Sequence, residues 1–154
     1  MHLVHAPIAT PAPGRDEIRV WADRHTLAKR RWRGAADDGT EFGFELERPL
    51  RPGDVVHETA TAAYVIRQHP EAVVTIDLGG LPPSAAAGIG WAVGNLHLEL
   101  SAEPSRLVAA DEPALRQLLA RLQVPFAAET AVFRPGRFSR GLQPSHELGP
   151  GHRH

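Results

Sequence analysis

The chain has no cysteine, and this absence limits the chemistry that it can carry. Without thiols it forms no disulfides, no iron–sulfur clusters and no thiolate zinc sites, so imidazole and carboxylate groups remain as metal ligands. Neither sign of charge dominates, because 17 basic residues face 18 acidic residues in a chain of 154. The sequence therefore lacks the strong overall field of most nucleic-acid and membrane-surface binders, and we expect its partners to be recognised locally.

Long apolar runs are also missing. The longest run, about residues 85–93, is interrupted by glycine and is too short to cross a bilayer. The N-terminus has no apolar segment behind a basic start, so it does not resemble a secretory signal. Together with the absence of cysteine, this predicts a cytoplasmic protein with no membrane partner.

Signatures of catalysis are scarce. The glycines at 88, 90 and 94 lack the Lys-Ser/Thr of a nucleotide-binding loop, and the sequence has neither His-Glu-x-x-His nor a serine in a nucleophile elbow. Asp37, Asp38 and Asp54 each lie beside or one step from a glycine, which is typical of turns. We predict that the chain is not an enzyme.

The length and the apolar content of 42% are sufficient for a buried core in two small lobes of an α+β protein. Residues 1–15 contain three prolines and little periodicity, which predicts a flexible N-terminal arm with no packed element. Residues 16–69 alternate between apolar and polar side chains and contain turn signals at 37–39 and 51–54. This pattern predicts an all-β lobe.

A second lobe is predicted over residues 70–136. Its pattern begins with a buried strand at 72–76 and an Ala-rich helix that is capped by Ser84 and ends near Val93. Two strands follow, at 96–100 and 106–109. A second helix is capped by Asp111 and places Leu115, Leu118, Leu119 and Leu122 on one face, and a last strand lies within 124–133. The order βαββαβ is that of the ferredoxin-like fold. From residue 137 the composition turns to Gly, Pro, Arg and His, which predicts a flexible tail over 137–154.

Histidine is the residue type that suggests a function. On the predicted strand His97 lies between two leucines and shares the opposite face with Glu99; by itself it is most simply a surface or interface histidine. The tail adds His146, His152 and His154, with a spacing that can chelate a borderline divalent ion. A two-fold dimer would bring two copies of His97 together, and the tail imidazoles would complete an open, exchangeable site.

A metal carrier needs such an incomplete site, because it must capture an ion and then release it. Nickel(II) accepts imidazole nitrogen and water as ligands. Zinc(II) and copper(II) compete for the same ligands, so residue types do not settle the selectivity.

The stretch 24–33 is strongly basic and includes one aromatic residue, Trp32. Such a stretch can bind phosphate or nucleic acid. The balanced overall charge favours a solvated strand face or a docking surface for an acidic protein partner, and we expect no nucleic-acid partner.

Several short motifs, spread over most of the chain, resemble those of the urease accessory nickel chaperone family, UreE. In the first lobe they are Arg30-Arg31-Trp32-Arg33, Asp38-Gly39, Leu50-Arg51-Pro52-Gly53-Asp54 and Pro70-Glu71. In the second lobe they are Gly94-Asn95-Leu96-His97 and Phe133-Arg134-Pro135.

The resemblance implies a homodimer joined through ferredoxin-like C-terminal lobes, with the two copies of His97 facing each other and a tail histidine completing the site. It implies Ni(II) as the cargo and a peptide-binding-like N-terminal lobe for protein docking. The expected partners are the urease accessory GTPase and the urease preactivation complex. The alternative is a non-catalytic interaction module whose histidines are incidental, and stoichiometric nickel binding separates the two.

Overall fold

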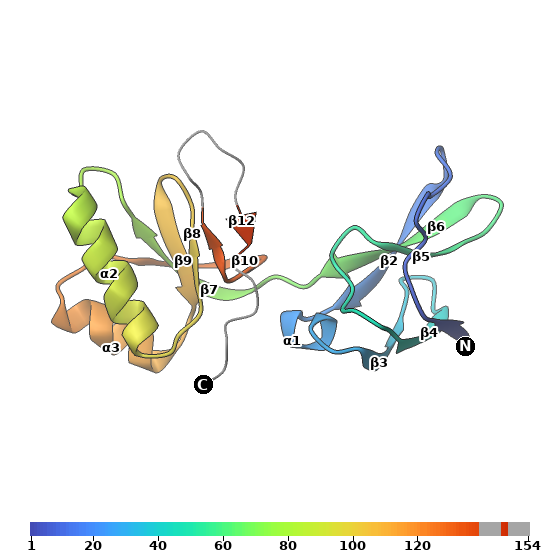
Figure 1. Ribbon diagram of the computed structural model, residues 1–154, viewed down its shortest axis with the longest axis horizontal. Helices are drawn as coiled ribbons and strands as arrows, with labels where there is room; N and C mark the ends of the chain where they lie inside the picture. The colour runs from blue at the N-terminus through green and yellow to red at the C-terminus, as the bar shows by residue number, and fades with distance from the viewer. Residues whose placement is uncertain (139–145, 148–154) are drawn as a thin grey trace. The chain divides into compact units, whose positions relative to one another are not determined.

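The structure is a computed structural model that describes residues 1–138 and 146–147 (Figure 1). The chain divides into two compact units, Met1–His69 and Pro70–His154. It combines several β-sheets with a few helices, so the predicted α+β class is confirmed. Within the described residues, no helix has the length and apolar character needed to cross a membrane.

The first unit consists of two three-stranded sheets. One has the strand order β1-β4-β3 and the other β2-β6-β5. The apolar side chains of both sheets form one core that includes Val20, Phe42, Phe44 and Ile66. The elements are β1 (His2–Val4), β2 (Asp16–Ala22), α1 (Arg24–Leu27), β3 (Arg31–Ala35), β4 (Glu41–Glu45), β5 (Val55–Glu58) and β6 (Ala62–Gln68).

The turn between β3 and β4 is held by local hydrogen bonds. Gly39 has φ +84°, a conformation that L residues rarely adopt. The Asp38 carboxylate accepts hydrogen bonds from the Thr40 N–H at 2.9 Å and the Tyr64 hydroxyl at 2.8 Å. These donors lower the pKa of Asp38, the Thr40 N–H most. The Asp-Gly signal therefore does form the predicted turn.

The N-terminal arm is more ordered than the sequence predicts. His2–Val4 forms β1, which pairs in parallel with β4 in the register His2 with Phe42, and Val4 is buried in the core. The expectation of no packed element over 1–15 is wrong for these residues. The prolines that suggested it all lie after β1, so they do not interfere with the ladder.

The basic stretch 24–33 is not one strand face, because α1 interrupts it. Asp23 caps this helix. Its carboxylate accepts hydrogen bonds from the Thr26 N–H at 2.8 Å and from the Thr26 hydroxyl at 2.7 Å. Both bonds lower the pKa of Asp23, the one from the hydroxyl most. The second half of the stretch runs into β3, where Trp32 packs on the core and Arg31 and Arg33 are exposed.

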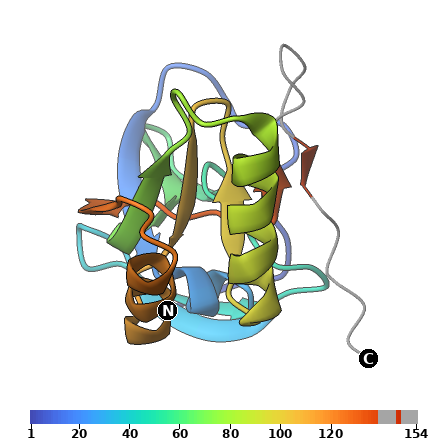
Figure 2. The same ribbon diagram turned by 90° about the vertical axis from the view of Figure 1, so that its left-hand side faces the viewer.

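The second unit has one sheet with the order β10-β7-β9-β8-β11-β12. Helices α2 and α3 cover the same face of this sheet (Figures 1 and 2), and their apolar sides bury Ile89, Val93, Leu115 and Leu119. The elements are β7 (Glu71–Asp77), α2 (Pro83–Asn95), β8 (Leu100–Ala102), β9 (Arg106–Ala110), α3 (Pro113–Arg121), β10 (Ala127–Ala131), β11 (Arg137–Phe138) and β12 (His146–Glu147).

Both predicted helix caps are wrong. Each helix begins with a proline at its first position, after Pro82 for α2 and Glu112 for α3, and the described residues give neither helix a side-chain cap. Proline has no N–H to satisfy there, which favours this start over a capping side chain. The Asp111 carboxylate instead pairs with Arg116 at 2.7 and 2.8 Å.

Candidate metal centre

The candidate centre begins with α2, which has no charged residue and contains three glycines, at 88, 90 and 94. Glycine lowers the stability of an isolated helix. Burial of Ile89 and Val93 against the sheet therefore provides most of the stability of α2. The helix ends in a hydrogen-bonded turn, where the N–H of Leu96 donates to the Val93 carbonyl at 3.2 Å and the N–H of His97 donates to the Gly94 carbonyl at 2.9 Å.

His97 occupies the residue after this helix cap, and its side chain is exposed. Its φ of +58° is in the left-handed region, where a residue other than glycine costs roughly 1–2 kcal/mol. Strain of this kind concentrates at functional sites, where the surrounding structure maintains it. The motif Gly94-Asn95-Leu96-His97 therefore forms a strained turn that presents one imidazole to solvent.

The predicted strand over 96–100 is wrong, because β8 begins only at Leu100. His97 and Glu99 consequently do not share a strand face. Leu98 and Leu100 do pack on the core, which explains the apolar alternation, but Leu96 closes the helix and is 38% exposed.

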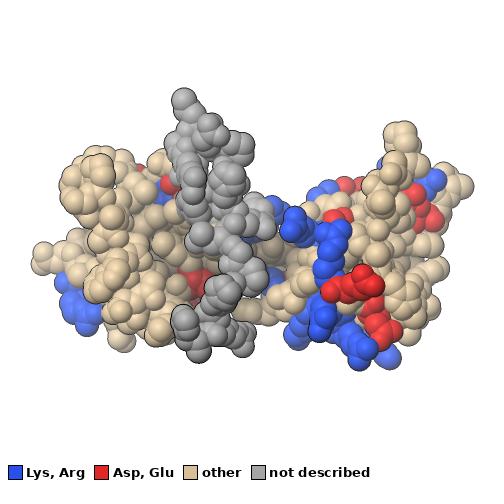
Figure 3. All heavy atoms as spheres, viewed as in Figure 1, with Lys and Arg blue, Asp and Glu red and all other residues tan. Residues whose placement is uncertain are grey.

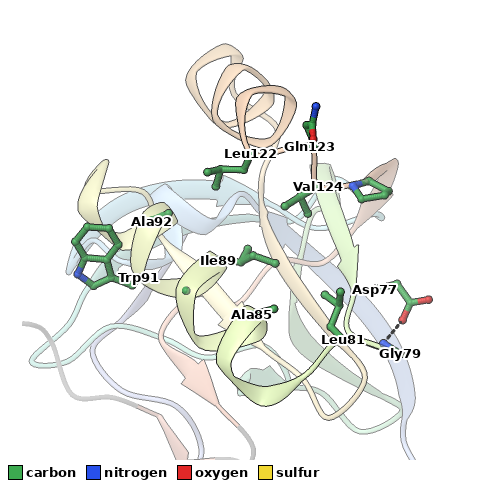
Figure 4. Close-up of a pocket in the computed structure, with 12 residues that line it drawn as sticks. Asp77, Gly79, Leu81, Ala85, Ile89, Trp91, Ala92, Leu122, Gln123 and Val124 are labelled. Atoms are coloured by element: carbon green, nitrogen blue, oxygen red, sulfur yellow. Dashed lines mark hydrogen bonds between the residues drawn. The ribbon is translucent and has the colours of Figure 1, made fainter.

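An apolar groove borders the same helix (Figure 4). It has a volume of about 820 Å³ and lies between α2 and the segment after α3, with Ala85, Ile89 and Trp91 on one side and Leu122 and Val124 on the other. Asp77 is the one charged residue in its lining, and its carboxylate already accepts a hydrogen bond from the Gly79 N–H at 2.8 Å. The groove is therefore suited to an apolar surface more than to a polar ligand.

Trp91 is the residue of this region that sequence reasoning missed. It is 72% exposed near the C-terminal end of α2, and Leu81, Leu96 and Leu122 are also exposed by 38–44%. A tryptophan in a helix made mostly of alanine and glycine was the available signal. Exposed large apolar side chains grouped around a groove mark an interaction surface.

The tail histidines are only partly placed. The backbone of His146 lies in β12, which pairs with β11 in the register Phe138 with His146. In turn β11 pairs with β8, the strand that follows the His97 turn. His152 and His154, and the flexible tail expected over 137–154 apart from β11 and β12, lie outside the described residues. Among the residues described, no three His, Asp or Glu side chains group to hold a metal ion.

Two other imidazoles meet in the first unit, and no sequence pattern predicts their contact. The rings of His2 on β1 and His57 on β5 lie 4.4 Å apart between centroids, beside Phe42 and Tyr64. Burial lowers the pKa of His57, and the charge of His2 lowers it further.

This pair predicts acid sensitivity of the first unit. In the unfolded chain His57 has a pKa of about 6.5, whereas in the folded chain its pKa is lower. The unfolded state therefore binds more protons as the pH drops below about 6.5, so the free energy of unfolding should fall. Urea unfolding followed by tryptophan fluorescence at pH 7.5 and 5.5 measures the loss. His57→Gln should reduce the difference between the two midpoints, and the matched variant His25→Gln should not. Equal differences in all three proteins would contradict this account.

Comparison with known proteins shows which family the chain resembles. A family model described as UreE urease accessory protein, C-terminal domain, matches residues 71–154. The urease accessory protein UreE of Pseudomonas putida (strain W619) is 33% identical over 119 residues, covering 75% of this chain and 73% of that protein. The UreE of Rhodobacter capsulatus is 32% identical over 165 residues, covering all of this chain and 99% of that protein.

A further relative is the UreE of Bifidobacterium longum subsp. infantis, which is 36% identical over 91 residues, or 56% of this chain and 39% of that protein. The matched region of the family model contains the second unit from its second residue onward, including the His97 turn and the apolar groove. The chain therefore belongs to the UreE family of urease accessory proteins.

Proposed function

We propose that this protein is a nickel metallochaperone that delivers Ni(II) for assembly of the urease active site. It works as a homodimer in which His97 from both copies holds the ion. The observation that carries the proposal is the Gly94-Asn95-Leu96-His97 turn, which in a chain of the UreE family presents an exposed imidazole at a strained helix end.

One imidazole per chain binds a metal weakly, so the second copy is part of the site. The tail histidines His146, His152 and His154 supply further nitrogen ligands, with an entropic cost of ordering that keeps the ion exchangeable. Zinc(II) and copper(II) compete for these ligands. The C-terminal end of α2 assists, because the partial negative charge of a helix end favours a cation by about 0.3–1 kcal/mol.

The apolar groove supports the dimer. A two-fold interface uses the same surface on both copies, so it needs a protrusion and a recess on one face. Trp91 is the protrusion and the groove beside it is the recess, and both border α2, the helix that comes just before His97. Two copies joined there would bring the two helix ends, and with them the two imidazoles, toward the symmetry axis.

The strand order supports assignment of the second unit to the ferredoxin-like class. Strands β10-β7-β9-β8 are antiparallel neighbours, and the chain order is βαββαβ. In the proposed function this unit carries the metal and the dimer contact. The β-rich first unit docks the partner proteins in the cytoplasm, namely the urease accessory GTPase and the urease preactivation complex. The protein carries its ion without catalysing a reaction.

Nickel titration calorimetry on the full chain, with the mass measured by light scattering in the same samples, tests the proposal. The expected result is one tight Ni(II) per dimer. A folded dimer without a tight ion would exclude the carrier and favour the non-catalytic interaction module. A tight ion on each separate monomer would exclude the shared site.

A further inference from the structure

Strand β3 is an edge strand of its sheet. In the order β1-β4-β3 its one strand neighbour is β4, and directly after β3 an isolated antiparallel bridge joins Ala36 to Val20 of β2. The stretch of β3 before that bridge therefore has one side of its backbone without a ladder in the described structure. Such an edge can accept a further strand.

The register identifies the backbone groups that face outward. The N–H of Leu46 donates to the Arg30 carbonyl at 2.8 Å, and the N–H of Ala36 donates to the Thr40 carbonyl at 2.9 Å. Hydrogen-bonded pairs recur at every second residue of an antiparallel pair, so residues 30, 32, 34 and 36 bond toward β4. The N–H and carbonyl groups of Arg31 and Arg33 therefore point to the free edge.

Cations surround this edge. The side chains of Lys29, Arg30, Arg31 and Arg33 are exposed, and we call these four residues the basic edge. In the described part of the chain, Arg31 pairs with Glu45 at 2.7 Å, whereas the other three have no ion-pair partner. Figure 3 shows Lys and Arg atoms gathered over α1 and β3. Acidic side chains placed here would relieve the repulsion among these cations.

The strand itself is firmly held. Trp32, between the outward-facing arginines, stacks on Phe44 with ring centroids 3.9 Å apart, and its side chain packs on the core. The edge is thus a preformed surface, so a ligand would bear most of the cost of ordering.

We propose that the basic edge docks an acidic, extended segment of a partner protein, which adds to β3 as a further strand. The free backbone groups of Arg31 and Arg33 pair with the segment's main chain, and the cations pair with its carboxylates. A second copy of β3 is repelled by its like charge, which gives the edge its selectivity. A peptide backbone fits this edge better than a nucleic acid, because the outward groups alternate between donor and acceptor at strand spacing.

The test uses the full-length protein and a short fluorescent peptide of alternating Glu and Val residues, with binding followed by anisotropy. We expect saturable binding that weakens with added salt. Arg30→Ser combined with Arg33→Ser should weaken it about tenfold. The matched pair Arg51→Ser with Arg121→Ser removes the same charge from other exposed sites and should have a much smaller effect.

Two further comparisons isolate the backbone contribution. Arg33→Pro removes the outward N–H in addition to the charge, while leaving the bonds to β4 intact, so it should bind more weakly than Arg33→Ser at equal thermal stability. A peptide with alternate N-methylated amides should also bind more weakly. Equal binding in both comparisons would overturn strand addition. If a single-stranded oligonucleotide bound more tightly than the peptide, and if this binding depended on Arg30 and Arg33, the partner would be a nucleic acid and the proposal would be wrong. Neither outcome involves nickel, so this inference can fail without the metal-carrier proposal.

Discussion

His97→Ala is expected to weaken nickel binding by more than about a hundredfold, since even loss of groups that only orient metal ligands costs 10–100-fold. In the proposed dimer each copy contributes one imidazole to the site, so this single substitution would remove two ligands at once. Calorimetry measures the loss, and light scattering checks that the variant is still a dimer. The fold should survive, since the His97 side chain is exposed and supports no core contact.

The strained turn provides a sharper version of this experiment. His97→Gly removes the imidazole and also relieves the positive φ of +58°, so the metal-free protein should be stabilised by about 1 kcal/mol while nickel binding is lost. His25→Ala, at an exposed histidine of α1, is the matched control and should retain nickel affinity. If His97→Gly kept the wild-type affinity, His97 would not be the ligand.

Trp91→Asp is expected to convert the dimer to monomers and, with them, to remove the shared nickel site. A buried interface tryptophan commonly contributes 2 kcal/mol or more, and a two-fold interface contains two, so the dimer should weaken by roughly a thousandfold. The monomer should stay folded because Trp91 is 72% exposed within one chain. Analytical ultracentrifugation over a range of concentrations measures the change.

Val132→Asp is the matched control for this prediction. Val132 is also an exposed apolar residue of the second unit, at 46%, but it does not line the groove. Its replacement should leave the dimer intact. A dimer of normal affinity in Trp91→Asp would mean that the copies meet elsewhere, and nickel bound tightly by a monomeric Trp91→Asp would mean that one chain suffices.

Much of the first unit could be predicted from the sequence because apolar residues repeat with a period of two and turn residues separate them. Phe42 and Phe44 do face the core, with the buried Gly43 between them, and the Asp38-Gly39 turn forms where its residue types require it. Strand propensity could not predict β1. This strand has three residues, His2–Val4, lies before a proline-containing segment and is stabilised by pairing with β4, which is distant in sequence.

The candidate site shows why residue types are easier to predict than geometry. The motif Gly94-Asn95-Leu96-His97 can be read directly from the sequence, but Leu96, Leu98 and Leu100 predict a strand by their period of two. In the structure the helix extends to Asn95, and the alternation spans a helix cap, a connection and the first residue of β8. Local pattern alone does not separate these possibilities, because Leu98 and Leu100 pack on the core in either case.

The groove was not predictable because it depends on tertiary structure. Leu122 fits the apolar face of α3 by its spacing, yet it is 44% exposed, since the helix ends at Arg121 and Leu122 turns toward α2 and the groove. The same holds for the His2 and His57 pair, which come from strands of different sheets.

The composition of α2 has a consequence for how the site responds to change elsewhere. This helix has little stability of its own, so the turn at His97 is ordered only as long as Ile89 and Val93 stay seated on the sheet. Opening of α2 by a local fluctuation would release the imidazole from its fixed position without unfolding the unit. If His97 holds nickel as proposed, packing of the core beneath the helix would affect how long the ion stays bound, and a substitution at Ile89 would shorten that time although Ile89 is not a proposed ligand.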